Sequence, residues 1–129
     1  MTKKIILMFI ISLIATALCG CTSNDEKELS MTYINISYEE ARQMMENNPS
    51  IIVLDVRTEQ EHRERNMHGS LLLPLNELTI ENALRVIPDK DSVVIVYCRS
   101  GARSSNAATA LINMGYINVY KMDGVIHWN

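Results

Sequence analysis

Two unbroken runs of apolar residues constrain the fold of this chain more than any other feature. Val93 to Tyr97 is the strongest strand signal, and Ile51 to Leu54 is a second run bounded by turn residues. Strands that face water on one side alternate apolar and polar residues, whereas strands buried on both faces are continuously apolar. Continuous runs of this kind are typical of a parallel sheet that helices cover on both sides.

Helix-like and strand-like segments alternate along the rest of the chain. Ser37 with Glu40 and Thr58 with Glu61 have capping-box spacing, so a helix is expected to begin after Ser37 and after Thr58. We also expect short strands at 33–36, 70–73 and 116–120, helices ending near 47 and spanning 78–86 and 104–114, and a final helical turn at 125–128. This order predicts an α/β fold with a mostly parallel central sheet of about five strands and helices on both faces.

The first twenty residues have the pattern of an export signal. Lys3 and Lys4 precede the fourteen uncharged residues from Ile5 to Leu18, and a stable membrane-crossing helix needs a longer run of about 20 apolar residues. The segment Leu18-Cys19-Gly20-Cys21 resembles the bacterial lipobox, and this resemblance implies cleavage before Cys21 and attachment of lipid to Cys21. An uncleaved anchor helix and an ordinary cleaved signal are the alternatives.

This interpretation divides the chain into a signal peptide at 1–20, a lipid-anchored polar tether at 21–31 and one domain at 32–129. The protein is then expected to be a membrane-anchored lipoprotein of the cell envelope, on its periplasmic or extracytoplasmic face. Without the signal, the chain carries 10 basic and 15 acidic side chains. Because a phosphate backbone binds a basic surface, we expect no nucleic-acid partner.

Cys98 would be the only thiol of the folded domain, because Cys19 leaves with the signal and Cys21 carries lipid. A single thiol cannot close an internal disulfide, so Cys98 is either an inert buried residue or a reactive one. The three histidines lack the spacing of metal ligands. We therefore expect neither a metal site nor a cofactor.

The residues after the strongest strand favour a reactive cysteine. Cys98 stands where this strand ends, and a loop of mostly small residues leads from it into a helix. Small residues let successive N–H groups point inward, the helix N-terminus adds partial positive charge, and two arginines add full charges. We expect these groups to lower the pKa of Cys98 and to hold an anionic substrate. The loop and the start of the helix read Arg99, Ser100, Gly101, Ala102, Arg103 and Ser104.

The segment from Tyr97 to Ser104 resembles the active-site loop of the rhodanese (thiosulfate sulfurtransferase) family in its single-domain form. In that family the cysteine takes up sulfane sulfur as a persulfide and passes it to a nucleophile. Cys98 to Arg103 spans six residues. The related phosphatases of the same fold have a loop that is one residue longer, so the loop length favours sulfur over phosphate.

Shorter motifs in the same order extend the resemblance over residues 32–129. The matching positions are Asp55-Val56-Arg57, Glu61, Gly69, Pro74, Gly124 and Trp128. The positions that depart from the family pattern, all outside the loop, are Arg65-Asn66, Ser70 and Asp123.

The resemblance implies that Cys98 is the catalytic nucleophile and that residues 99–104 bind the substrate. Thiosulfate or another small sulfur-containing anion would be the donor, and cyanide, a thiol or a protein would accept the sulfur. Asp55 and Arg57 are expected to form an ion pair beside the site. Two alternatives stay open: an envelope module for redox chemistry or partner binding, and a phosphatase or arsenate-handling enzyme on the same fold.

Overall fold

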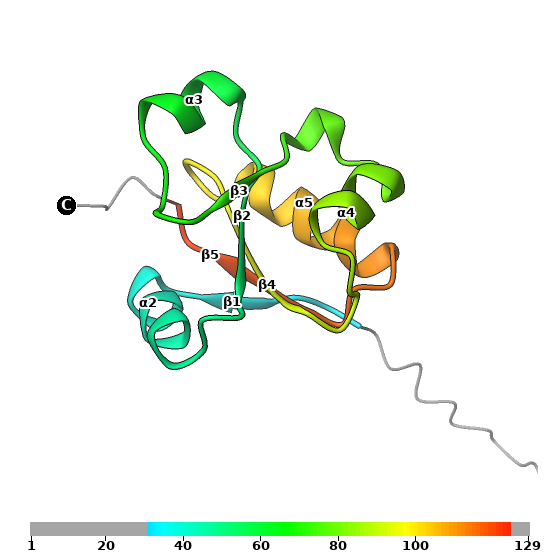
Figure 1. Cartoon of the computed structure of the whole chain (residues 1–129), viewed down its shortest axis with the longest axis horizontal. Helices are drawn as coiled ribbons and strands as arrows, with labels where there is room; N and C mark the ends of the chain where they lie inside the picture. Colours follow the sequence, from blue (N-terminus) through cyan, green and yellow to red (C-terminus); the bar gives the residue numbers. More distant parts are fainter. Residues whose placement is uncertain (1–30, 125–129) are drawn as a thin grey trace, which may run out of the picture.

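A parallel five-stranded sheet forms the centre of the computed structural model, which describes residues 31–124. The strands lie in the order β1-β5-β4-β2-β3, with β4 in the middle (Figure 1). The predicted α/β class with its central parallel sheet is confirmed. The strand bounds are β1 (Ile34–Ile36), β2 (Ile52–Asp55), β3 (Leu71–Leu72), β4 (Val93–Tyr97) and β5 (Asn118–Met122).

The central strand β4 is buried because both of its faces are apolar. Val94 and Val96 pack into the hydrophobic cluster on one side of the sheet, and Ile95 and Tyr97 pack into the cluster on the other side. All four side chains are inaccessible to solvent. The continuous apolar run therefore predicted this strand correctly, since a parallel strand covered on both faces has no polar side.

Helices cover both faces of the sheet. In Figure 1, α4 and α5 lie on one side and α2 on the other, and α3 lies beyond the end of β2. Both predicted capping boxes are formed, at the starts of α2 and α3. The bounds are α2 (Tyr38–Asn47), α3 (Glu59–Glu64), the short 3-10 helix η1 (Leu75–Glu77), α4 (Ile80–Val86) and α5 (Ala102–Asn113).

Helix α5 begins two residues earlier than the expected start at Ser104. Gly101 adopts a left-handed backbone conformation with φ 98° and caps the helix. Its carbonyl oxygen accepts a hydrogen bond from the N–H of Ser105 at 3.0 Å, which starts the helical pattern at Ala102. Only glycine takes this conformation routinely, because it has no Cβ.

The last strand is shifted by two residues from the expected 116–120. Tyr116 instead completes the turn after α5, where its N–H donates to the carbonyl of Leu111 at 3.1 Å. Its buried hydroxyl donates to the carbonyl of Ile87 at 2.8 Å.

The expected helix at 78–86 begins only at Ile80, since Thr79 caps it. The short helix η1 before it was not predicted.

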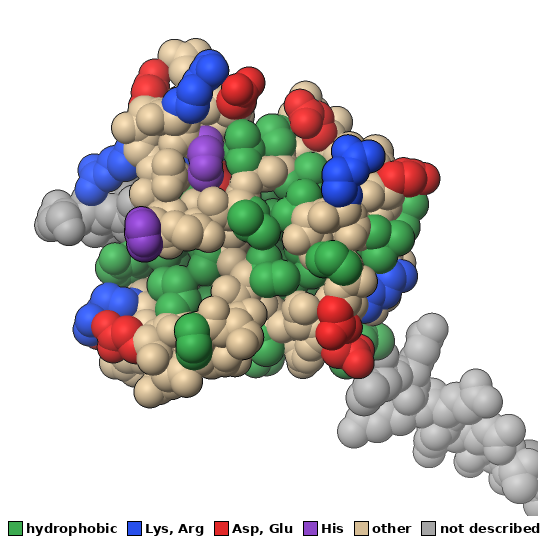
Figure 2. Space-filling model, viewed as in Figure 1, with side chains coloured by type: hydrophobic (Ala, Val, Ile, Leu, Met, Phe, Trp, Pro, Cys, Tyr) green, Lys and Arg blue, Asp and Glu red, His purple; other side chains and the backbone are tan. Residues whose placement is uncertain are grey.

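The surface of this domain mixes charges of both signs. On the face drawn in Figure 2, acidic and basic side chains alternate near the edges, and hydrophobic side chains gather between them. Within residues 31–124, no helix combines the length and the apolarity that a bilayer crossing needs. The predicted signal peptide, the lipidation site Cys21, nearly all of the tether and the final turn at 125–128 lie outside the described residues.

Candidate active site

The loop after β4 curls around the sulfur atom of Cys98. The N–H of Gly101 donates a hydrogen bond to Cys98 Sγ at 3.0 Å, and the N–H of Ser104 donates to the same atom at 3.3 Å. The left-handed conformation of Gly101 turns the backbone so that these donors converge. The predicted inward-facing N–H groups are therefore present, and they are supplied by the start of α5.

These donors stabilise a thiolate at Cys98. Burial on its own raises the pKa of this fully buried thiol, because it disfavours the charged form. Hydrogen bonds from Ser104 and from the N–H groups of Gly101 and Ser100 outweigh burial, so the pKa of the thiol lies below its ordinary value. The direction agrees with the expectation from the sequence, which named the loop N–H groups, the helix N-terminus and two arginines, and hydrogen bonds are the main interactions that lower this pKa.

The hydroxyl of Ser104 is a further partner of the sulfur. Ser104 is inaccessible to solvent, and its Oγ lies 3.4 Å from Cys98 Sγ and donates to the carbonyl of Gly101 at 3.0 Å. In the neutral thiol, the S–H group donates to this oxygen. In the thiolate, rotation of the hydroxyl turns its hydrogen toward the sulfur, which adds an O–H donor to the backbone N–H donors.

The remaining loop residues point outward. Arg99 and Ser100 are exposed, and Ala102 is the exposed first residue of α5. Within the described part of the chain, the Arg99 side chain has no hydrogen bond or ion pair. It is therefore available to an incoming anion at the rim of the loop.

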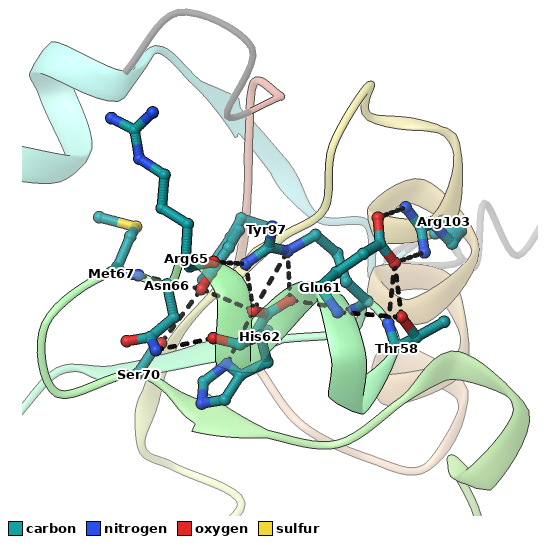
Figure 3. Close-up of polar contacts among 11 residues, drawn as sticks. Thr58, Glu61, His62, Arg65, Asn66, Met67, Ser70, Tyr97 and Arg103 are labelled. Atoms are coloured by element: carbon teal, nitrogen blue, oxygen red, sulfur yellow. Dashed lines mark hydrogen bonds and ion pairs between the residues drawn. The ribbon is translucent and has the colours of Figure 1, made fainter. Parts of the chain in front are cut away.

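Arg103 pairs with Glu61, and the negative charges of Glu61 and Cys98 raise the pKa of its guanidinium. Its two terminal nitrogens donate to the two carboxylate oxygens at 2.7 and 2.8 Å, and Figure 3 shows this fork. Arg103 lowers the pKa of Glu61 to about 2, with a further contribution from hydrogen bonds of Thr58. The sequence indicated Glu61 only as a capping residue and a family position, and no local signal links residues 61 and 103.

Asp55 is the centre of a buried polar cluster beside the loop. Its fully buried carboxylate accepts hydrogen bonds from Arg57, at 2.7 Å from Nη2, from Tyr97 Oη at 2.8 Å and from His62 Nδ1 at 2.9 Å. The expected ion pair between Asp55 and Arg57 is thus present. Burial raises the pKa of Asp55, and the bonds from Arg57, His62 and Tyr97 overcome this effect and leave the pKa below its ordinary value.

Tyr97 connects this cluster to the segment after α3. Its hydroxyl accepts from the N–H of Met67 at 3.2 Å and lies 3.1 Å from Ser70 Oγ, as drawn in Figure 3. The carbonyl of Arg65 accepts from Arg57 Nη2 at 2.5 Å. Arg65 and Ser70, two of the positions that depart from the family pattern, therefore contact this cluster and not the loop.

A cavity opens between the cluster and η1. Its volume is about 290 Å³. Arg57 and Arg103 contribute to its wall, and Val56 and Leu75 pack in the same cluster as Cys98. Cys98 itself does not line this cavity, and Arg103 is the residue that it shares with the 98–104 segment. Its lining residues are Val56, Arg57, Thr58, Pro74, Leu75, Asn76 and Arg103.

Gly124 lies directly against the outer side of the loop. A Cβ atom at this position would lie 2.1 Å from the carbonyl oxygen of Arg99. The family position quoted from the sequence therefore has a steric reason, because only glycine leaves room for the loop backbone.

Together, the groups around Cys98 form a site for nucleophilic sulfur chemistry. The N–H groups stabilise negative charge on Sγ or on an atom attached to it. No cluster of three or more metal-ligating side chains exists in the 31–124 segment. The chemistry that this geometry supports is attack by the Cys98 thiolate on an electrophilic atom, with the loop holding the anionic product.

The chain is similar to a known family and to several known proteins. Residues 37–127 match the family described as the Rhodanese-like domain. Thiosulfate sulfurtransferase PspE of Escherichia coli (strain K12) is 33% identical over 72 residues, which cover 56% of this chain and 68% of that protein. A sulfurtransferase of Allochromatium vinosum is 34% identical over 94 residues, which cover 72% of this chain and 85% of that protein. A solved structure, "rhodanese with anions from E. coli", is 32% identical, has a TM-score of 0.55, and is matched over 58% of this chain and 87% of its own.

Proposed function

Because the chain belongs to the family of rhodanese-like domains, we propose that it is a sulfurtransferase that carries sulfane sulfur on Cys98. Relatives that are named as sulfurtransferases support the general activity. The observation that carries the proposal is the set of N–H donors from Gly101 and Ser104 that converge on Cys98 Sγ. This arrangement stabilises a sulfur anion, and both the resting thiolate and the persulfide intermediate are sulfur anions.

In the first step, the Cys98 thiolate attacks the outer sulfur of the donor. With thiosulfate, the bond between Sγ and the outer sulfur forms while the sulfur–sulfur bond of thiosulfate breaks. Sulfite leaves with the electron pair of that bond. The terminal sulfur of the Cys98 persulfide carries the negative charge, which the loop N–H groups and the helix N-terminus stabilise.

In the second step, a nucleophile attacks the outer sulfur of the persulfide. Cyanide would leave as thiocyanate, and a thiolate would leave as a persulfide. The bond to Sγ breaks, and its electron pair returns to Cys98 as the thiolate. The covalent intermediate predicts ping-pong kinetics.

The burial of Cys98 favours small reagents over a protein partner. The side chain is inaccessible to solvent, and the neighbouring cavity has a volume of about 290 Å³. Thiosulfate or a small persulfide would reach the buried sulfur more readily than a folded protein thiol. This supports sulfur transfer with small donors and acceptors over a redox module that forms mixed disulfides with a protein.

The test is a mass measurement of the Cys98 peptide after incubation with thiosulfate. We expect a mass increase of one sulfur atom in the wild type, its removal by cyanide, and no increase in C98S. The circular dichroism spectrum of C98S should match that of the wild type, because serine preserves the size of the side chain. Sulfur transfer by a folded C98S protein would exclude the mechanism.

We also propose that the mature protein is anchored to a membrane of the cell envelope through lipid on Cys21. The lipobox-like segment that ends at Cys21 supports this proposal. In fractionated bacterial cells, the wild type and C98S should appear in the membrane fraction, and C21S should not carry lipid. Equal lipid labelling of C21S and the wild type would contradict the proposal.

A further inference from the structure

Lys121, on β5, packs against the turn that holds the Cys98 sulfur. Its Nζ and Cε atoms each lie 3.7 Å from the position that a Cβ atom of Gly101 would occupy. Gly101 is the residue whose N–H donates to Cys98 Sγ at 3.0 Å. Standard bond lengths then place the ammonium within about 10 Å of the sulfur.

The Lys121 side chain is largely buried, and its charge has little compensation from acidic groups. Its side chain is only 15% exposed. Among residues 31–124, the one carboxylate within ion-pair distance is that of Asp123, whose oxygen lies 3.9 Å away on a side chain that is 65% exposed. A long ion pair with an exposed partner stabilises a charge weakly.

The position of Lys121 is unfavourable with respect to the dipole of α5. Gly101 is the N-terminal cap of this twelve-residue helix, and a helix N-terminus carries partial positive charge. A cation is usually found at the opposite end, where Lys90 indeed lies: its Nζ donates to the carbonyl of Met114 at 2.6 Å. An anion at the N-terminus of α5 would offset the repulsion between the Lys121 ammonium and the positive end of the helix dipole. The thiolate of Cys98 lies at this N-terminus.

The other charged groups that face the loop are largely paired. Arg103 is bound to Glu61, and Arg57 is bound to Asp55. Arg99 is exposed at the rim. Lys121 is therefore, among the described residues, the cation that faces the loop from β5. Its ion-pair partner, Asp123, is 3.9 Å away.

We propose that Lys121 is a positioning residue for Cys98, whose ammonium stabilises the sulfur anion through the Gly101 turn and increases the affinity of the loop for anionic reagents. The second part of this inference, the preference for an anionic sulfur donor, rests on the proposed function. The first part concerns the acidity of the thiol and does not depend on any enzymatic activity.

The test compares alkylation of Cys98 by iodoacetamide across a pH series in the full-length wild type, K121M, K121R and K90M. Peptide mass spectrometry isolates Cys98 from the other cysteines of the chain. We expect K121M to raise the pH of half-maximal alkylation by about 0.5 to 1, because a positive charge is lost near the thiolate. K121R keeps the charge and should behave as the wild type. K90M removes the lysine that lies beside the C-terminal end of α5 and should have no effect.

A second pair of reagents tests the attraction of anions. Iodoacetate and iodoacetamide are similar in size and differ in charge, so the ratio of their rates with Cys98 reports the local potential. K121M should lower this ratio about threefold to tenfold, and K90M should leave it unchanged. With thiosulfate, kcat/KM of K121M should fall in parallel.

The outcomes separate this inference from the proposed function. If K121M alkylates as the wild type does with both reagents, the role of Lys121 is excluded even if sulfur transfer is observed. If Lys121 changes alkylation but no persulfide forms in the wild type, the role of Lys121 stands and the sulfurtransferase proposal fails. K121Q provides the same comparison if K121M does not fold.

Discussion

Tyr97 is the last residue of β4, and its side chain lies on the opposite side of the sheet from the sulfur of Cys98, the next residue. Its hydroxyl donates to Asp55 and accepts from the N–H of Met67. The register of the sheet places Tyr97 directly beside Asp55, which is why two residues 42 positions apart share a hydrogen bond. At the scale of single residues, neighbouring positions therefore have separate surroundings: Cys98 presents its sulfur to the N–H groups of the loop, and Tyr97 fixes the strand ends on the other side of the sheet.

We expect Tyr97→Phe to destabilise the protein without removing its chemistry. The substitution leaves the buried N–H of Met67 unpaired and removes one donor from the Asp55 carboxylate, at a cost of about 1–3 kcal/mol in the free energy of unfolding. Urea unfolding measures this cost, and persulfide formation at Cys98 should remain. A Y97F variant as stable as the wild type would show that the hydroxyl contributes nothing to the fold.

At the scale of elements, the site is made by the transition from β4 to α5. A strand that ends at the edge of a parallel sheet and a helix that begins there place N–H groups and partial positive charge at the same point. The sharp turn between the strand and the helix requires the left-handed conformation of Gly101, with φ 98°. The second glycine that matters here is Gly124, which leaves space for the carbonyl of Arg99.

A pair of glycine substitutions separates stability from reactivity. Gly69 and Gly101 both have positive φ, and an alanine at either position would meet no close contact. We therefore expect Gly69→Ala and Gly101→Ala each to lower the free energy of unfolding by about 1–2 kcal/mol, the cost of the left-handed conformation. Only Gly101→Ala should slow the alkylation of Cys98, because only that turn aims an N–H at the sulfur. Equal alkylation rates in the two variants would contradict this assignment of Gly101.

At the scale of the whole molecule, the pair of Glu61 and Arg103 joins α3 to α5 beside the loop that holds Cys98. Glu61 also closes the capping box of α3, so one carboxylate holds both the start of a helix and the contact between two helices. This contact fixes Arg103, which lines the cavity next to η1. The shape of this cavity therefore depends on an ion pair between residues that no sequence motif connects.

This ion pair predicts how stability depends on acid. The pKa of Glu61 falls from its ordinary 4.5 to about 2, mainly through Arg103, so the pair contributes fully above about pH 4.5 and is lost as the pH falls toward 2. Denaturant unfolding should show that wild type is more stable than E61Q at neutral pH and that the difference shrinks across this range. Glutamine at this position retains the capping box.

The matched control for this titration is E40Q. Glu40 closes the equivalent capping box of α2 but has no arginine partner in the described structure. The difference in stability between the wild type and E40Q should therefore depend less on pH than the difference between the wild type and E61Q does. Identical curves for the two variants would mean that the pair with Arg103 adds nothing to the stability of the domain.

The residue pattern by itself determined the strands, most of the helices and the loop of N–H groups around Cys98. These features depend on neighbours in the chain: a continuous apolar run predicts a buried strand, a serine or threonine three residues before a glutamate predicts a helix start, and small residues after a buried strand predict a loop of inward N–H groups. The start of α5 and the bounds of β5 were each two residues off, because the conformation of Gly101 and the burial of Tyr116 override local propensity.

The partners of each charge were decided only in three dimensions. Arg103 was expected near the substrate or thiolate; its charge does interact with that of Cys98, and the fold also pairs it with Glu61, 42 residues away. Lys121 and Gly124 reach the loop because β5 lies beside β4, an adjacency that strand order sets and that no spacing in the chain reveals. Electrostatic interactions depend on distance in space, so the sequence could identify the cysteine and its helix but not the full set of charges that surround them.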